Sequence, residues 1–244
     1  GVAGGVVGWG ETGSCAGRGG AGGVVGEGRL VPVGGVGRGD SPGWARTGRS
    51  PKGRGARANE ALEIITRLWR EENVTFEGEH YQVREATITP RPVQNPLPIW
   101  IGGSSPAAIR RTVRYGSGWL APLEGPEEAG KTVEAIKTEA RRQGREIPDD
   151  HYGASILYRL VAGKTGNAKD DFGADQPAAI RERLAKVTVV GDAEAFLSRV
   201  AEYNAVGIDK FVVIPLARTE SEFVEQTRLL DREVISQGLQ HGSH

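Results

Sequence analysis

Short apolar runs separated by turn residues recur along the chain from residue 28 onward and predict β-strands. They are rich in Val, Ile, Leu and Trp. Pro32 lies in the first run and favours an edge strand, because proline has no N–H to donate to a ladder. The predicted strands cover residues 29–33, 99–101, 118–120, 152–161 and 211–214.

Between these runs, apolar residues recur at helical spacing. Asn59 and Asp192 each precede such a segment and are predicted to be N-caps. Pro106 stands near the start of another helix, where its missing N–H costs nothing. The predicted helices cover residues 59–69, 106–113, 127–143, 177–186, 192–200 and 223–234.

Strands that alternate with helices predict βα units around a parallel sheet, and therefore an α/β fold of the (β/α)₈ TIM-barrel type. Five such strands are visible, whereas a closed barrel needs eight. Two segments stand outside this alternation. A β-hairpin is predicted at 74–83, around the turn Glu77-Gly78, and a polar loop at 163–176.

Residues 1–27 differ from the rest of the chain. Glycine there is far above its usual share of about 7%. The segment has neither strand nor helix periodicity and is predicted to be disordered. The expected organisation is therefore a glycine-rich segment at 1–27, a partial barrel domain at 28–238 and a polar tail at 239–244.

Composition excludes several classes of function. Lys+Arg and Asp+Glu number 31 each, so the net charge is zero and nothing predicts a nucleic-acid or anionic-membrane partner. The mean hydropathy is −0.38, and no apolar run is long enough to span a membrane. Cys15 is the one cysteine, and the first residues lack a signal-peptide pattern. The predicted location is the cytoplasm, and a homo-oligomer is compatible with the sequence.

The most informative stretch for chemistry is PIWIGGSSPAAI, from Pro98 to Ile109. An apolar strand ends in Gly102-Gly103, and Ser104-Ser105 lead into a helix. Glycines allow close approach of a ligand, and the N–H groups of a helix's first turn favour an anion. The serine hydroxyls could add donors to a phosphate. An equally weighted alternative is a tight glycine turn followed by a serine that caps the helix.

Other polar residues carry weaker signals. No histidine pair has the spacing of metal ligands, so no metal site is predicted. The sequence identifies no catalytic residue. Trp119 follows Gly118 in a predicted strand, where it could touch a ligand or belong to the core. The turn from Gly37 to Ser41 could lie at a strand end facing the same ligand.

Several motifs occur in an order that resembles the luciferase-like monooxygenase family, from about Gly28 to Gln237. Members are flavin- or deazaflavin-dependent oxidoreductases. The run GRLVPVGGVGRGDS resembles the strand-four region of deazaflavin-type members. The other motifs are RANEALEIITRLW, VTFEGEHYQV, PRPVQNPLPIWIGGSSPAAIRR, YGSGW and VVGDAEAFLSRVAEYNAVGIDKFVV.

The resemblance implies a (β/α)₈ barrel in which this chain supplies strands four to eight. It implies a phosphate-anchored cofactor, either the deazaflavin coenzyme F420 or FMN, with a slight preference for F420. Ser117 departs from the acidic residue often found before the Gly-Trp pair. The implied cofactor-binding residues are Gly102, Gly103, Ser104, Ser105, Gly118, Trp119, Gly39 and Asp40.

Strands one to three have no recognisable counterpart in residues 1–27. The leading expectation is an oxidoreductase or monooxygenase of this family that acts on a small organic substrate. The alternative is a non-catalytic, phosphate-binding half-barrel or an inactive fragment of such an enzyme.

Overall fold

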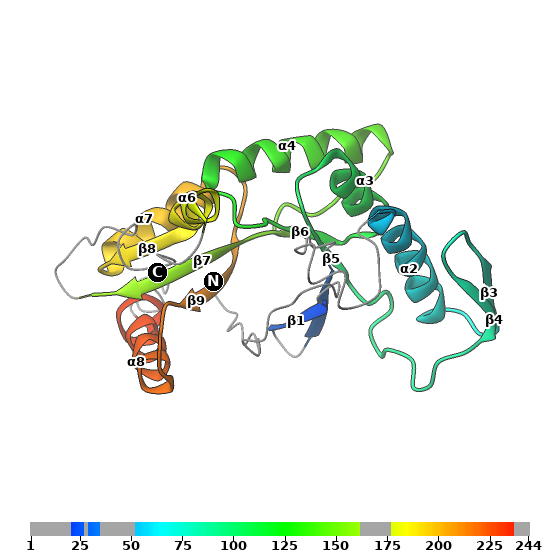
Figure 1. The fold of residues 1–244 in the computed structure, drawn as a ribbon, viewed down its shortest axis with the longest axis horizontal. Helices are drawn as coiled ribbons and strands as arrows, with labels where there is room; N and C mark the ends of the chain where they lie inside the picture. Colours follow the sequence, from blue (N-terminus) through cyan, green and yellow to red (C-terminus); the bar gives the residue numbers. More distant parts are fainter. Residues whose placement is uncertain (1–20, 27–28, 35–51, 162–176, 237–244) are drawn as a thin grey trace, which may run out of the picture.

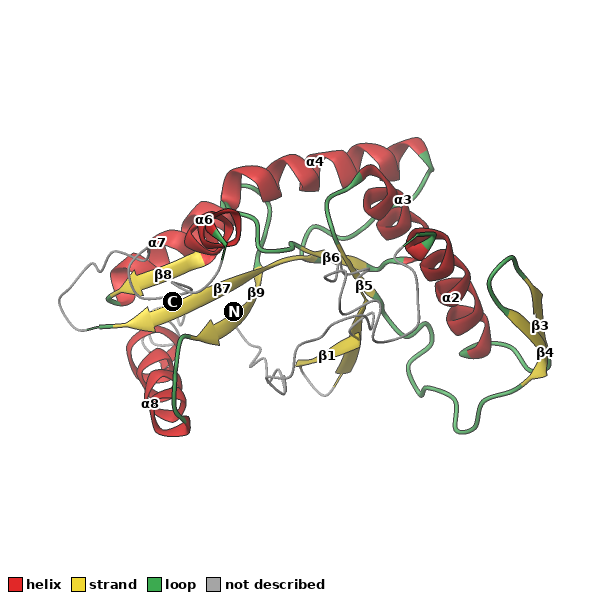
Figure 2. Ribbon diagram, in the orientation of Figure 1, coloured by secondary structure: helices red, strands yellow, loops and turns green. Residues whose placement is uncertain are grey.

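The computed structural model describes residues 21–26, 29–34, 52–161 and 177–236. Within them an α/β fold is built on one mixed sheet, with a separate hairpin beside it (Figures 1 and 2). The hairpin and α2 lie at one end of the molecule, and α8 lies at the other (Figure 1). The loop predicted at 163–176 lies outside the described residues, as does the tail at 239–244.

Five parallel strands form the main part of the sheet, and all five predicted strands are confirmed. Each neighbouring pair is joined by a crossover that contains a helix or a longer connection, as expected for βα units. In spatial order they are β2 (Arg29–Gly34), β5 (Trp100–Gly102), β6 (Gly118–Leu120), β7 (Tyr152–Leu160) and β9 (Lys210–Pro215).

Strand β7 has three partners because it is the longest strand. Gly153 pairs with both β6 and β9, so these two strands lie on opposite edges of β7. Leu157 pairs with both β9 and β8 (Thr188–Gly191), so β8 shares an edge with β6 further along β7. Strand β9 therefore ends the parallel array, and no described residue pairs with its outer edge.

At the other end of the array the structure corrects two expectations. Residues 21–26, predicted to be disordered, form strand β1 (Ala21–Gly26), which pairs antiparallel with β2 from Ala21↔Gly34 to Gly26↔Arg29. Strand β2 is therefore not an edge strand, although Pro32 favoured one. It pairs with β5 only through Val33 and Gly34, beyond the proline.

The helices confirm the predicted order, with some shifted ends. Asp192 caps its helix as predicted, since its Oδ1 accepts the Ala195 N–H at 3.0 Å. Figure 1 draws α4, α6 and α7 above β7 and α8 below it. The helices are α2 (Arg54–Leu68), α3 (Pro106–Tyr115), α4 (Pro126–Arg142), α6 (Ala178–Val187), α7 (Ala193–Asn204) and α8 (Glu220–Leu230), which continues as a π-helical turn, η1 (Asp231–Ile235).

The prediction that Asn59 caps a helix is wrong. Helix α2 begins at Arg54, after Gly53 in the left-handed region at φ 73°. Asn59 lies inside the helix, and its Oδ1 accepts a 2.9 Å hydrogen bond from Nε of the buried Arg111 on α3. The side chain thus joins two helices instead of beginning one.

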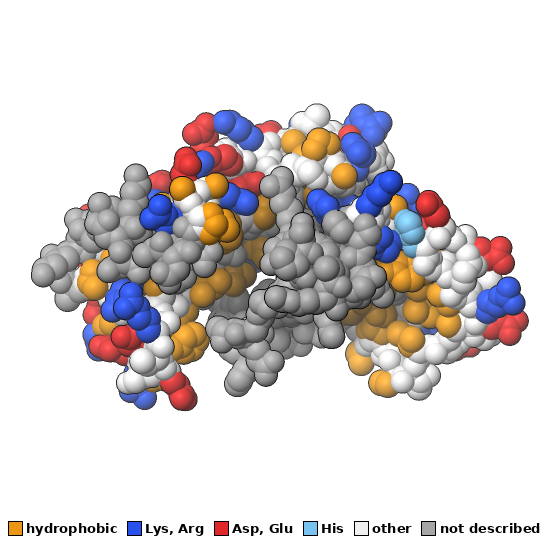
Figure 3. All heavy atoms as spheres, in the orientation of Figure 1, with side chains coloured by type: hydrophobic (Ala, Val, Ile, Leu, Met, Phe, Trp, Pro, Cys, Tyr) orange, Lys and Arg blue, Asp and Glu red, His pale blue; other side chains and the backbone are white. Residues whose placement is uncertain are grey.

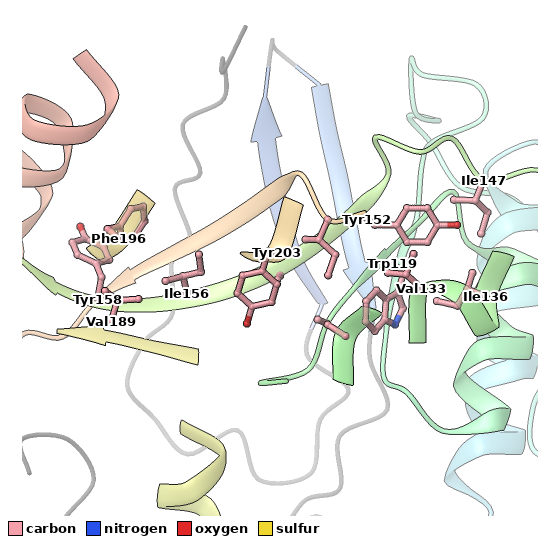
Figure 4. Packing of buried hydrophobic residues seen from close by; sticks show 14 of the residues in the cluster. Trp119, Val133, Ile136, Ile147, Tyr152, Ile156, Tyr158, Val189, Phe196 and Tyr203 are labelled. Atoms are coloured by element: carbon pink, nitrogen blue, oxygen red, sulfur yellow. The ribbon is translucent and has the colours of Figure 1, made fainter. Parts of the chain in front are cut away.

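The core lies between the sheet and the helices that cover it. Its largest fully buried side chains are Trp119 on β6, Tyr152 and Tyr158 on β7 and Tyr203 on α7, and Val133 and Ile136 of α4 pack with them. Figure 4 shows them as a continuous row from Phe196 to Ile147. On α8, buried Gln226 extends the ladder of β7: its amide accepts from Leu160 N at 2.7 Å and donates to Leu160 O at 3.1 Å.

The charged surface has no dominant sign. Lys and Arg side chains alternate with Asp and Glu on the face shown in Figure 3, in keeping with a net charge of zero. Within the described part of the chain, no helix is both long enough and apolar enough to cross a membrane.

The predicted hairpin is present as β3 (Val74–Glu77) and β4 (Gln82–Ala86). Glu60 on α2 attaches it to the body of the protein. The Glu60 carboxylate accepts hydrogen bonds from the amides of Glu79, His80 and Tyr81 at 2.9–3.0 Å. A side chain thus satisfies three turn amides that no ladder could reach.

We expect the hairpin to loosen in acid through Glu60. Burial acts to raise the pKa of this carboxyl, but the three N–H donors outweigh it and hold the pKa below the usual 4.5. A depressed folded-state pKa means that the contact is complete above pH 4.5 and is lost as the pH falls through the lowered value. Amide protection factors at residues 79–81 should fall there, and Glu60→Gln should show low protection at every pH. Equal protection in both proteins at neutral pH would contradict this role.

Candidate anion site at the carboxyl ends of β5 and β6

Strands β5 and β6 end side by side and place the predicted site residues at one edge of the sheet. Gly102 pairs with Leu120 at the ends of the two strands. Gly103 to Ser105 then connect β5 to α3, and Ala121 to Gly125 connect β6 to α4. This is the edge at which ligands bind in parallel α/β folds.

Of the two glycines, Gly103 is the one whose backbone conformation requires a glycine. Its φ is +108°, and an added Cβ would lie 3.1 Å from Cβ of Ala108. Gly102 is less constrained, since a Cβ there would lie 3.6 Å from the Leu120 carbonyl oxygen. The diglycine therefore forms a turn without side chains that leads to the amino end of α3.

Ser105 is the N-cap of α3, which bears out the alternative interpretation of this serine. Its Oγ accepts the Ala108 N–H at 3.2 Å, and Pro106 follows at the first helical position. Of the four positions at this end whose N–H groups have no intrahelical partner, Ala108 is thus satisfied and Pro106 has no N–H. The amides of Ser105 and Ala107 remain for an anion, and the amide of Ser104 lies just before the helix.

Ser104 has a partner that the sequence analysis did not anticipate. Its hydroxyl donates to Oε1 of Glu124, which follows β6. As it stands in the structure, this hydroxyl is directed to a carboxyl group and not to an anion. The sequence could have indicated this contact. Glu124 follows the predicted strand at 118–120, which comes directly after the strand that leads into Gly102.

Glu124 is half-buried beside the site. Its Oε2 is fully shielded and has no hydrogen-bond partner within the described residues. Burial raises the pKa of this carboxyl above 4.5, while the Ser104 hydroxyl and the charges of Arg183 and Lys186 act in the opposite direction. An unsatisfied, desolvated carboxylate oxygen is costly, so protonation is favoured more here than in water.

Trp119 supports the site from within the core. Its side chain is 0% exposed, and its Nε1 donates to the Gly103 carbonyl at 2.9 Å. The indole can therefore fix the diglycine turn, but its side chain presents no surface to a ligand. Of the two roles considered for Trp119, the structure gives it the core position (Figure 4).

Gly118 lies at the start of β6, paired with Trp100, and not at the strand end that faces the anion site. A Cβ at Gly118 would lie 2.5 Å from the Trp100 ring, which also covers Gly153 on β7. Beside it, Ser117 donates to the Ile99 carbonyl at 3.1 Å. These residues pack the opposite end of the sheet, so the expected placement of Gly118 is corrected.

We expect Gly118→Ala to destabilise the fold by about 1–3 kcal/mol, because the methyl group overlaps a ring held between two strands. Urea denaturation with fluorescence detection measures the change. Gly55→Ala is the matched control. Gly55 lies in α2, and the nearest atom to an added Cβ would be in the Arg111 side chain, 3.4 Å away, which is an ordinary contact distance. The control should be neutral or slightly stabilising. Equal midpoints for the two variants would contradict this packing role.

Two further site predictions, Gly39 and Asp40 in the Gly37–Ser41 turn, lie outside the described residues. Two surface hollows, of about 710 and 510 Å³, lie against α8 and between α3 and α4. Neither is lined by residues 102–105 or by Glu124. Among the residues with described positions, no group of three or more His, Cys, Asp or Glu is arranged to hold a metal ion.

The parallel sheet with covering helices and the glycine turn at a strand end define the class: an α/β protein with a parallel sheet and a candidate anion site at its carboxyl edge. The model of the luciferase-like monooxygenase family matches residues 25–161, more than half of the 244 residues. The chain therefore belongs to the luciferase-like monooxygenase family.

Individual relatives point the same way. The F420-dependent glucose-6-phosphate dehydrogenase of Nakamurella multipartita is 37% identical over 123 residues, 43% of this chain and 36% of that protein. A second such dehydrogenase, from Microbacterium testaceum, is 28% identical over 204 residues, 73% of this chain and 59% of that protein. The chain thus matches less than two thirds of the length of either relative.

Solved structures share the fold. An F420-dependent secondary alcohol dehydrogenase, in complex with an F420-acetone adduct, has a TM-score of 0.68 at 16% identity, over 84% of this chain and 68% of that chain. The monooxygenase RslO1 from Streptomyces bottropensis has a TM-score of 0.65 at 20% identity, with the same coverage. The α/β fold is therefore similar to that of luciferase-like TIM-barrel enzymes.

Proposed function

We propose that the protein is an F420- or FMN-dependent oxidoreductase of the luciferase-like family that binds the cofactor phosphate at the amino end of α3. One observation carries the proposal: a glycine turn at the carboxyl end of β5 leads directly into a helix N-terminus. That arrangement is an anion-binding geometry at the functional edge of the sheet.

The residues present fit a phosphate group. Gly103 lacks the side chain that would obstruct approach, and the amides of Ser104, Ser105 and Ala107 supply donors beside the positive end of the α3 dipole. Trp119 holds the turn through the Gly103 carbonyl. When bound, the reduced flavin or deazaflavin supplies a hydride or activates oxygen, while the protein supplies position and electrostatics.

F420 is the preferred cofactor within this proposal. The sequence already favoured it through the run from Gly37 to Ser41, which contains Gly39 and Asp40. The names of the relatives from Nakamurella multipartita and Microbacterium testaceum add support, since both are F420-dependent dehydrogenases. We propose a small organic substrate, no nucleic-acid or membrane partner, and the cytoplasm as the location.

The domain organisation is also part of the proposal. The five parallel strands correspond to strands four to eight of a barrel, within a domain at 28–238 flanked by segments at 1–27 and 239–244. The order β2-β5-β6-β7-β9 supports this assignment.

A second candidate function is a phosphate-binding half-barrel without catalytic activity. One observation favours it. An antiparallel strand, β1, occupies the edge of β2 where a parallel neighbour would stand in a barrel.

Titration of FMN and of F420 against the purified protein, followed by absorbance and by desalting, tests the proposal. Retention of the coloured cofactor supports an oxidoreductase. Binding of inorganic phosphate without retention of either cofactor supports the half-barrel. Failure to bind any of the three would contradict the anion site itself.

A further inference from the structure

The hydrogen bond between Ser104 and Glu124 places a carboxyl group where the proposed phosphate would need a donor. The Ser104 hydroxyl carries one hydrogen, and it is donated to Oε1 of Glu124. In this arrangement the Ser104 hydroxyl has no hydrogen left to donate to a phosphate, and only its oxygen lone pairs can face the phosphate. An ionised Glu124 would also repel the phosphate charge.

Charged groups from two helices face Glu124. Arg183 and Lys186 on α6 favour its ionised form, and Glu128 on α4 disfavours it. From α7, the Tyr203 hydroxyl donates to the Glu124 carbonyl at 2.7 Å, which fixes the backbone and leaves the carboxyl group free to titrate. The shielded Oε2 has no partner among the described residues.

We propose that Glu124 is a positioning residue that takes up one proton from solvent when the cofactor phosphate binds, then donates to Ser104 Oγ and turns the Ser104 O–H toward the phosphate. The inference rests on the proposed function. It adds a proton-coupled donor to the phosphate site, and no covalent bond changes.

The sign of the pH dependence follows from the two states. In the free protein, burial raises the pKa of Glu124, with Ser104, Arg183 and Lys186 opposing the rise. A bound phosphate adds a negative charge and raises that pKa further. Between the free-protein pKa and the higher pKa of the complex, binding therefore takes up a proton, and affinity should fall by up to about tenfold per pH unit.

The test is FMN titration from about pH 5 to about pH 9 with the wild-type protein and Glu124→Gln, a range that brackets a raised carboxyl pKa. The glutamine amide donates at every pH. The ratio of the two Kd values cancels the ionisation of FMN and of groups common to both proteins. We expect the two Kd values to converge at low pH, and the wild-type protein to bind progressively more weakly than Glu124→Gln as the pH rises.

Ser104→Ala separates positioning from simple charge repulsion. If Ser104 donates to the phosphate only when Glu124 is protonated, this change should weaken wild-type binding by about fivefold to tenfold at low pH and not at high pH. In the Glu124→Gln protein, the same change should weaken binding at every pH. A Ser104→Ala effect that does not change with pH in the wild-type background would contradict the positioning role.

Calorimetry of the wild-type protein needs no variant. Binding heats in buffers of different ionisation enthalpy should show uptake of up to one proton between the free-protein pKa and the pKa of the complex, and none well below the free-protein pKa. Measurable FMN binding with a constant Kd ratio and no proton uptake would overturn this inference and leave the proposed function intact. If neither protein binds FMN or F420 at any pH, both proposals fail together.

Discussion

Turnover by the 244-residue chain is expected to be at least about a hundredfold slower than turnover by a chimera that carries three N-terminal βα units from an intact relative. Catalysis in a βα barrel draws on residues from the ends of several strands. The proposed phosphate site lies at β5 and β6, while the outer edge of β9 has no partner among the described residues. This site would anchor the cofactor phosphate without holding the reactive ring.

The comparison uses reduced FMN and reduced F420 with a panel of aldehydes and enones. Oxidised F420 is used with alcohols and with glucose 6-phosphate, which is added because a relative carries that name. The donor of the N-terminal units is the Nakamurella multipartita dehydrogenase, joined before Arg29. A chimera with Gly103→Val serves as the control, and it should lose activity if the phosphate site is required. Equal turnover by the chain and the chimera would show that the chain completes its own site.

Gly103→Val is expected to weaken binding of FMN and F420 by well over about tenfold, or more than about 1.4 kcal/mol. The valine must adopt φ near +108°, which β-branched residues rarely do, and its Cβ would lie 3.1 Å from that of Ala108. Relief of either strain rotates the turn and withdraws the amides that precede α3. Isothermal titration measures the loss.

The matched control for backbone strain is Gly144→Val. Gly144 has φ +63° with nothing within 4 Å of an added Cβ. It lies near Arg145, which contacts the carboxyl end of α3 and not its amino end. This variant should lose stability and keep its affinity. Unchanged affinity in Gly103→Val would rule out the assigned phosphate site.

The periodic parts of the fold could be predicted from the sequence, because burial sets their pattern. The apolar runs of β5, β7 and β9 and the caps at Ser105 and Asp192 each follow from a few adjacent residues. Strand β1 could not be predicted in this way. Its glycine-rich sequence has no alternating face, and its pairing with β2 is the only signal of a strand.

The local structure around the proposed site was predicted in part for the same reason. The glycine turn and the helix N-terminus are local, so the sequence shows them directly. The role of Gly118 depends on the Trp100 ring from the neighbouring strand, and the direction of the Ser104 hydroxyl depends on Glu124, twenty residues away. Asn59 has the residue type of a cap, but its partner is Arg111 on another helix. Contacts between segments decided these three cases.

The most direct measurement of the central claim compares FMN with riboflavin, which has the same ring and no phosphate. Both are titrated against the wild-type protein and against Gly103→Val. We predict that the wild-type protein binds FMN at least about tenfold more tightly than riboflavin, and that Gly103→Val removes most of this difference. Equal affinities for FMN and riboflavin in the wild-type protein would contradict a phosphate site at the amino end of α3.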